Sequence, residues 1–313
     1  MKSRRRGIHL FRFAGVDVWL HWYWFLFAAF EITNRSNKYT SMGWNAAEYL
    51  ALFFFVLLHE YGHALACRQV GGTANEIMLW PLGGMAYVAP PLRPGATLWC
   101  NAAGPLVNVA VLIVLGPPGY MLDQSFKLDR TAPNIHSFLL ALAFINVLLL
   151  AFNLLPIYPL DGGQIIRSLL WFAVGRARSL MAAAAIGFAG VAGLLYLAIR
   201  LRMAGQWTSA LWLFVLALFV FGGCWGGLRE VRILTHLSEL PRRQGFACPS
   251  CKVAPPVGSY WKCSRCAKTF DTFQNRATCP NCGVEYPQTM CLDCRKQHPM
   301  GDWVARAPVP IDA

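Results

Sequence analysis

The stretch Leu58–Ala64 carries two histidines four residues apart, with a glutamate directly after the first, in the pattern H-E-x-x-H. On a helix, residues four apart share a face, so His59 and His63 would both reach one metal ion. Glu60 would then lie beside the ion and take a proton from a water there. The flanking residues are apolar, and burying Glu60 in a membrane span costs at least about 2.5 kcal/mol unless a partner compensates. A cation is such a partner; the alternative is a polar contact between helices.

A third ligand is expected, because catalytic zinc usually has three protein ligands and one water. The segment Asn153–Gly163 ends an apolar stretch with two prolines, an aspartate and two glycines. Prolines interrupt helices and glycines permit unusual backbone angles, as a built site at membrane depth requires. Outside the C-terminal tail, Asp161 is the carboxylate that lies in such a turn. It is therefore the candidate third ligand, although it could instead cap the helix that follows.

The C-terminal tail contains four C-x-x-C pairs, which are typical of zinc ribbons in a reducing compartment. Eight thiolates predict two structural zinc ions. Trp261–Gly283 resembles a single zinc ribbon, which would pair the second knuckle with the third, while sequential and cross-braced pairings remain open. The candidate ligands are Cys248, Cys251, Cys263, Cys266, Cys279, Cys282, Cys291 and Cys294.

The rest of the chain is predicted to form transmembrane helices that position the candidate ligands. Hydrophobic residues make up 56% of the 313 residues and charged residues 14%, whereas soluble domains have about 25% charged residues. Apolar stretches predict about six transmembrane helices, each near the roughly 20 residues that a bilayer demands. The segment 71–91 predicts a short β-hairpin. The expected spans are 17–33, 47–70, 96–116, 136–155, 179–200 and 207–227.

The predicted fold class is therefore an all-α polytopic membrane protein with a short β-hairpin, followed by a small C-terminal zinc-ribbon domain. We expect the membrane domain to cover residues 1–235 and the double zinc-ribbon-like domain residues 245–300. The net charge of +13 is dispersed over loops, which favours anchors at the lipid bilayer over a nucleic-acid surface. The distribution of basic residues, beginning with Lys2, Arg4, Arg5 and Arg6, predicts a multi-pass protein of the cell membrane with both termini in the cytosol.

Four sequence elements together resemble the site-2 protease family of intramembrane metalloproteases, in particular the six-span branch with the protease that processes a sporulation sigma factor. The resemblance covers roughly residues 8–230. Its elements, in family order, are His59-Glu-Tyr-Gly-His63, Pro81-Leu-Gly-Gly84, Gly104-Pro-Leu-Val-Asn108, and Asn153-x-x-Pro156 with Leu160-Asp161-Gly162. The zinc-ribbon tail departs from the family pattern, so the mode of regulation does not carry over.

The resemblance implies a zinc endopeptidase that cuts membrane-spanning protein substrates in regulated intramembrane proteolysis. Zinc would polarise the scissile carbonyl while Glu60 moves the proton. Asn108 and Asn153 are candidates for holding the substrate backbone, and hydrogen bonding between helices is the alternative. The tail would contact a regulatory protein, and nucleic acid is not expected as a partner. A non-catalytic metal-binding membrane scaffold or a metal transporter is the competing function.

Overall fold

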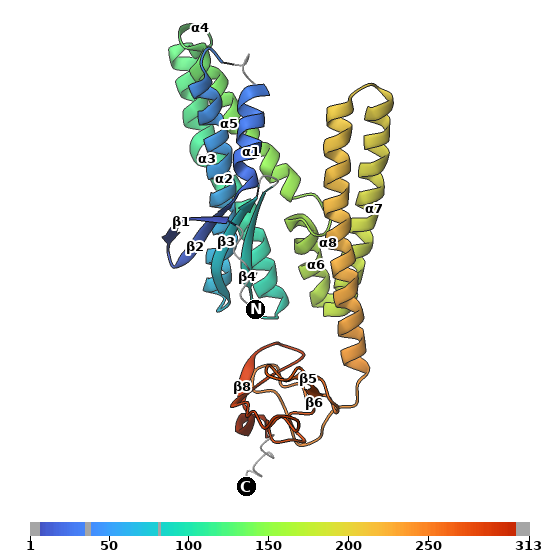
Figure 1. Cartoon of the computed structure of the whole chain (residues 1–313). Helices are drawn as coiled ribbons and strands as arrows, with labels where there is room; N and C mark the ends of the chain where they lie inside the picture. Colours follow the sequence, from blue (N-terminus) through green and yellow to red (C-terminus); the bar gives the residue numbers. More distant parts are fainter. Residues whose placement is uncertain (1–6, 35–38, 81–82, 305–313) are drawn as a thin grey trace, which may run out of the picture. The chain divides into compact units, whose positions relative to one another are not determined.

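The computed structural model describes residues 7–34, 39–80 and 83–304 (Figure 1). Contacts divide the chain into two compact units, Met1–Leu228 and Arg229–Ala313, each with its own hydrophobic core. The basic residues at positions 2 to 6 and the hairpin residues Pro81 and Leu82 lie outside the described residues.

Long apolar helices build the first unit and confirm the predicted class of polytopic helical membrane protein. Within the described residues, five helices are long and apolar enough to cross a membrane. They are α2 (Met42–Gln69), α3 (Pro94–Phe126), α5 (Pro133–Asn153), α7 (Arg176–Met203) and α8 (Trp207–Glu239). The short helix α4 (Leu128–Thr131) connects α3 to α5, and α6 (Asp161–Val174) precedes α7.

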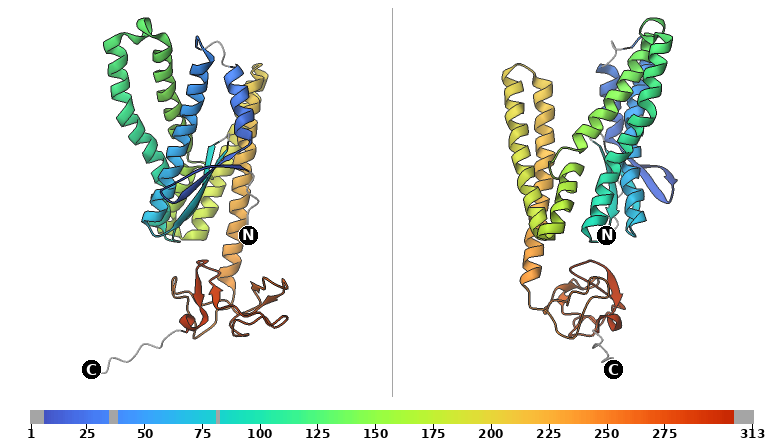
Figure 2. Two further views of the ribbon diagram at one scale, coloured as in Figure 1. Left: turned by 60° about the vertical axis from the view of Figure 1, so that its left-hand side comes forward. Right: turned by 180° about the vertical axis from the view of Figure 1, so that it is seen from behind.

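The long helices fall into two groups within this unit. Helix α3 packs against α2, α5 and α6, and α2 also packs against α5. Figure 2 shows α7 and α8 as a hairpin of two helices joined by a short turn. Helix α6 contacts both α3 and α7, and so connects the two groups.

A four-stranded sheet lies against α2, in the order β1-β2-β3-β4. Strands β3 (Thr73–Trp80) and β4 (Gly83–Ala89) form an antiparallel hairpin, as the sequence predicted for this segment. Strands β1 (Gly7–Phe13) and β2 (Val16–His21) form a second hairpin, and β2 pairs with β3 in parallel. The sheet's buried side chains, including Val16, Val18, Ile77 and Leu79, join the apolar core of α2.

The first span predicted, 17–33, needs correction. Its first part is β2, and helix α1 (Tyr23–Asn34) has only 12 residues. At 1.5 Å per residue, α1 extends about 18 Å, against a hydrocarbon core of about 30 Å. Val16 and Val18 are fully buried while Asp17 between them is not, so the period is two, as in a strand. The high apolar content of this stretch concealed that alternation.

The second unit contains two small sheets, β5 (Trp261–Lys262) with β6 (Thr269–Phe270) and β7 (Gln288–Met290) with β8 (Gln297–Pro299), followed by the 3-10 helix η1 (Met300–Trp303). Cysteines and aromatic side chains share its core. Trp261, Phe270 and Phe273 are buried there, as expected for a small core around metal sites, whereas Tyr260 is 38% exposed.

Candidate metal centre

His59, His63 and Asp161 meet at one point although 102 residues separate the first from the last. The Nε2 atoms of the two histidines are 3.1 Å apart. Asp161 Oδ2 lies 3.0 Å from His59 Nε2 and 3.2 Å from His63 Nε2. Tetrahedral zinc with ligands at 2.0–2.1 Å would space its ligand atoms by about 3.3 Å. The three atoms are therefore spaced as ligands of a single zinc ion would be.

The hydrogen bonds of both histidines orient their Nε2 lone pairs toward this point. His63 Nδ1 donates to the backbone carbonyl of Cys100 at 2.7 Å, and that oxygen can only accept. His59 Nδ1 lies 2.5 Å from Asn108 Oδ1, also an acceptor. In the neutral rings each Nε2 therefore lacks a proton. Two lone pairs and a carboxylate oxygen converge, which is a donor set that a divalent cation fits.

Glycines in α2 and α3 allow this approach. A Cβ at Gly62 would lie 2.8 Å from the carbonyl oxygen of Ala103, so Gly62 lets α3 come close to α2. A Cβ at Gly104 would overlap His63 Nε2 and lie 2.7 Å from His59 Nε2. Gly104 thus keeps the space beside the ligand atoms open.

Asp161 is the first residue of α6 and directly follows a tightly folded turn. A Cβ at Gly162 would overlap the carbonyls of Leu154 and Leu155, and one at Gly163 would overlap the backbone at Tyr158. Both glycines therefore permit a close backbone approach. The turn is anchored to α8, where Cys224 Sγ lies 3.1 Å from the Tyr158 carbonyl oxygen.

Glu60 is buried between α2 and the sheet. Its Oε2 accepts a hydrogen bond of 2.8 Å from the backbone N–H of Ala86 in β4. A Cβ at Gly84 would overlap the Glu60 carboxyl group, so the glycine allows the carboxylate to lie against this strand. The β3–β4 hairpin therefore positions the carboxylate beside the two histidines that flank it in sequence.

The two asparagines expected to contact substrate occupy different environments. Asn108 is 1% exposed, and its amide bonds His59 with Oδ1 and Asn146 with Nδ2. Hydrogen bonds at both ends of this amide, to α2 and to α5, favour the alternative of hydrogen bonding between helices over a contact with substrate. Asn153 is half-buried at the last residue of α5.

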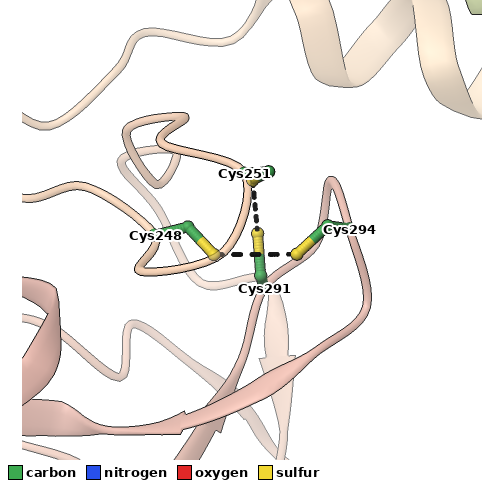
Figure 3. A group of neighbouring side chains, drawn as sticks. All are labelled: Cys248, Cys251, Cys291 and Cys294. Atoms are coloured by element: carbon green, nitrogen blue, oxygen red, sulfur yellow. Dashed lines mark hydrogen bonds between the residues drawn. The ribbon is translucent and has the colours of Figure 1, made fainter. Parts of the chain in front are cut away.

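In the second unit, the structure brings the first cysteine pair to the fourth (Figure 3). Cys248 Sγ lies 3.6 Å from Cys294 Sγ, and Cys251 Sγ 3.7 Å from Cys291 Sγ. Zinc–sulfur bonds of 2.3 Å in a tetrahedron would space the sulfurs by about 3.8 Å. These four thiols are therefore arranged as the ligands of a four-cysteine zinc site.

The second cysteine pair meets the third, which is the pairing that the resemblance to a single ribbon implied. Cys263 Sγ lies 3.5 Å from Cys282 Sγ, and Cys266 Sγ 3.7 Å from Cys279 Sγ. The Tyr286 hydroxyl donates a hydrogen bond of 3.0 Å to Cys263 Sγ and, together with the backbone N–H groups of Cys266 and Arg265, lowers the pKa of that thiol to about 6. The thiolate that zinc binds is thereby favoured.

Several residues around the membrane site were not found from the sequence: the Cys100 carbonyl, the Ala86 amide and Asn146. The residue type does not reveal which backbone N–H or carbonyl group will bond a site residue, because almost every residue has both groups. Asn146 could have been noticed, because it is a single amide within the apolar run Phe144–Leu150. Such a residue in a membrane helix indicates an interhelical contact or a site.

Comparison with known proteins agrees with this geometry. Residues 121–197 match peptidase family M50. Zinc metalloprotease MJ0392 of Methanocaldococcus jannaschii is 32% identical over 234 residues, which are 75% of this chain and 64% of that protein. Stage IV sporulation protein FB of Bacillus subtilis is 30% identical over 120 residues, or 37% of this chain and 38% of that protein.

Among solved structures, the site-2 protease from Methanocaldococcus jannaschii is 28% identical, with a TM-score of 0.48, and the alignment covers 71% of this chain and 94% of that one. The chain spans slightly less than two thirds of the archaeal metalloprotease's length and a smaller share of the sporulation protein's. The family match over residues 121–197 and the two sequence relatives agree with the resemblance that the motifs indicated. Residues 121–197 of the chain thus match peptidase family M50, and the chain is similar in sequence to an archaeal zinc metalloprotease and to a sporulation protein.

Proposed function

We propose that this protein is an intramembrane zinc metalloprotease that hydrolyses peptide bonds of membrane-spanning protein substrates. The observation that supports this most is the convergence of His59, His63 and Asp161 beside Glu60, within a bundle of apolar helices. A metal-binding scaffold or a transporter would not need a carboxylate held beside the metal ligands by its own hydrogen bond.

In this proposal, His59, His63 and Asp161 hold one zinc ion and the two four-cysteine clusters hold one each. When bound, the catalytic zinc would supply Lewis-acid polarisation of the scissile carbonyl and activation of water. The lone pairs of the two histidines and one Asp161 oxygen form the three-ligand set that leaves a fourth position open. The four-cysteine clusters are closed sites, and their metal would stabilise the fold of the tail.

Glu60 acts as the general base and then as the acid. The Ala86 N–H fixes one carboxylate oxygen, so the other is left to take a proton from the attacking water and to pass it to the leaving amine. Asn153 is our candidate for a contact with the substrate backbone, because it ends α5 eight residues before Asp161. Its half-buried side chain is accessible for such a contact.

We further propose that both termini are cytosolic, from the distribution of Lys and Arg over the connecting segments. The tail would then be a cytosolic module that presents substrates or blocks their entry, through contact with a regulatory protein. Replacing Cys263 and Cys266 by Ser should unfold it and change the rate or site of cleavage without removing hydrolysis. Identical rates and sites in wild-type, Cys-substituted and tail-deleted chains would contradict a regulatory role.

The proposed activity can be tested by co-expressing the protein with a panel of single-span membrane proteins, each tagged at both ends. At least one should be cut within or beside its span. The cut should be lost in the His63→Ala variant and, in purified proteoliposomes, on removal of zinc, and zinc should restore it. Cleavage that continues in His63→Ala at the wild-type rate would overturn the proposal.

A further inference from the structure

A second buried asparagine, Asn146 in α5, lies behind the metal centre. It is 1% exposed, whereas its neighbours Phe144, Val147 and Leu148 are exposed on the outer face of α5. Its Oδ1 accepts a hydrogen bond of 2.6 Å from Asn108 Nδ2, and its Nδ2 donates one of 2.9 Å to the Asn108 backbone carbonyl. Both ends of this amide are therefore directed to a single residue of α3.

These bonds determine which way each amide points. The Asn108 backbone carbonyl can only accept, so Asn146 must direct Nδ2 toward it and Oδ1 toward the Asn108 side chain. The Asn146 oxygen then requires Nδ2 of Asn108, which leaves Oδ1 of Asn108 for His59. If the Asn108 amide turned over, two donors would meet at His59 Nδ1 and two acceptor oxygens would meet at Asn146.

On its other side, Asn146 lines an apolar cavity of about 510 Å³ between α3 and α5. The polar groups Asp123 and His136 in the cavity wall bond each other at 2.6 Å. His136 precedes Asn146 by ten residues, which is about 15 Å along a helix. Neither group therefore competes with Asn108 for the amide of Asn146.

We propose that Asn146 is a positioning residue for the zinc ligand His59. Through Asn108 it fixes the ring orientation of His59 and the proton on Nδ1, so that the Nε2 lone pair faces His63 and Asp161. This inference rests on the proposed function, because it assumes that these three residues hold zinc. It assigns one residue each of α5, α3 and α2 to a single chain of donors and acceptors ending at the metal.

The test measures zinc release rather than proteolysis. Purified full-length protein is mixed with a chelator and zinc release is followed over time. The same measurement on a His63→Ala variant reports the zinc held by the cysteines, and the difference between the two is the zinc of the membrane site. Partners of metal-bound histidines typically change metal affinity by 10–100-fold, and Asn146 acts one step further away. We expect Asn146→Leu to release this zinc about 10-fold faster.

A matched control is Asn45→Leu, which removes another buried amide from the bundle, in α2. It should leave zinc release unchanged. Asn146→Ala, which also removes both hydrogen bonds to Asn108, serves if the leucine variant does not fold. A double-mutant cycle separates positioning from packing: adding Asn146→Leu to Asn108→Leu should change release by less than about 2-fold, since the two act through one pathway.

The outcomes are distinguishable. If wild type holds zinc that the His63→Ala variant lacks, and both Asn146 variants release that zinc at the wild-type rate, the positioning role is wrong. If the effects of Asn108→Leu and Asn146→Leu multiply in the double variant, Asn146 acts on packing and the proposal also fails. If wild type and His63→Ala contain the same amount of zinc, the proposed function fails, and the positioning role fails with it.

Discussion

The Nε2 atoms of His59 and His63 lie 3.1 Å apart, and while both rings are neutral neither Nε2 donates a hydrogen bond to the other. Their Nδ1 protons are engaged by Asn108 Oδ1 and by the Cys100 carbonyl. The facing lone pairs, with Asp161 Oδ2 beside both, repel one another unless a metal cation or a proton lies between them. This relationship, more than the H-E-x-x-H spacing, supports the proposal that the site binds a metal.

The space beside these lone pairs depends on Gly104. Gly104→Ala should weaken zinc binding at this site by at least about 10-fold, because its methyl group would overlap the ligand nitrogens. Zinc content of the purified chain, after subtraction of the cysteine-bound ions, measures this. Gly116→Ala in the same helix is the control, because a Cβ there would meet no heavy atom within 4 Å. Equal zinc loss in the two variants would mean that helix perturbation, not overlap, is responsible.

A substitution at Gly84 tests the role of Glu60 separately from the role of the metal ligands. Gly84→Ala should push the Glu60 carboxyl group away from β4 and reduce cleavage at least about 10-fold, roughly the effect of losing a hydrogen bond to a charged group. Zinc should stay bound, since no ligand is touched. Parallel measurement of zinc content and cleavage of one substrate checks both. A variant that lost its zinc would show that the hairpin supports the metal site itself.

The nested pairing of the cysteine knuckles can be read from zinc stoichiometry. Cys251→Ser with Cys291→Ser removes ligands from one cluster and should cost the chain one zinc ion. Cys251→Ser with Cys263→Ser affects both clusters and should cost two. The two double variants carry the same number of substitutions, so each is the control for the other. Equal losses would contradict the pairing.

How far the sequence predicted this structure depends on where the determining contacts lie. The fold class followed from long apolar runs, and His59 and His63 from the local geometry of one helix. Asp161 could be selected because prolines and glycines around it indicated a broken helix. These signals are local in the chain. The structure places the three residues together, as the expectation of a single site with three ligands required.

Other features depended on contacts between distant segments. The span predicted at 17–33 proved to be β2 and a short helix, because pairing with β3 stabilises the strand and no local signal reports that partner. Asn108 was a candidate for contact with substrate, with hydrogen bonding between helices as the alternative, because its residue type does not reveal that Asn146 and His59 bond both ends of its amide. The first and fourth knuckles, 40 residues apart, could be matched only by the fold of the tail.

The central claim is that Glu60 performs chemistry on a peptide bond beside a zinc ion that it does not bind. The direct measurement is cleavage of one single-span substrate in proteoliposomes by wild type and by Glu60→Gln, with the zinc content of both determined. We predict equal zinc, and cleavage by the variant reduced at least about 100-fold, the lower range for a general base. Cleavage at the wild-type rate by a Glu60→Gln protein would contradict the account.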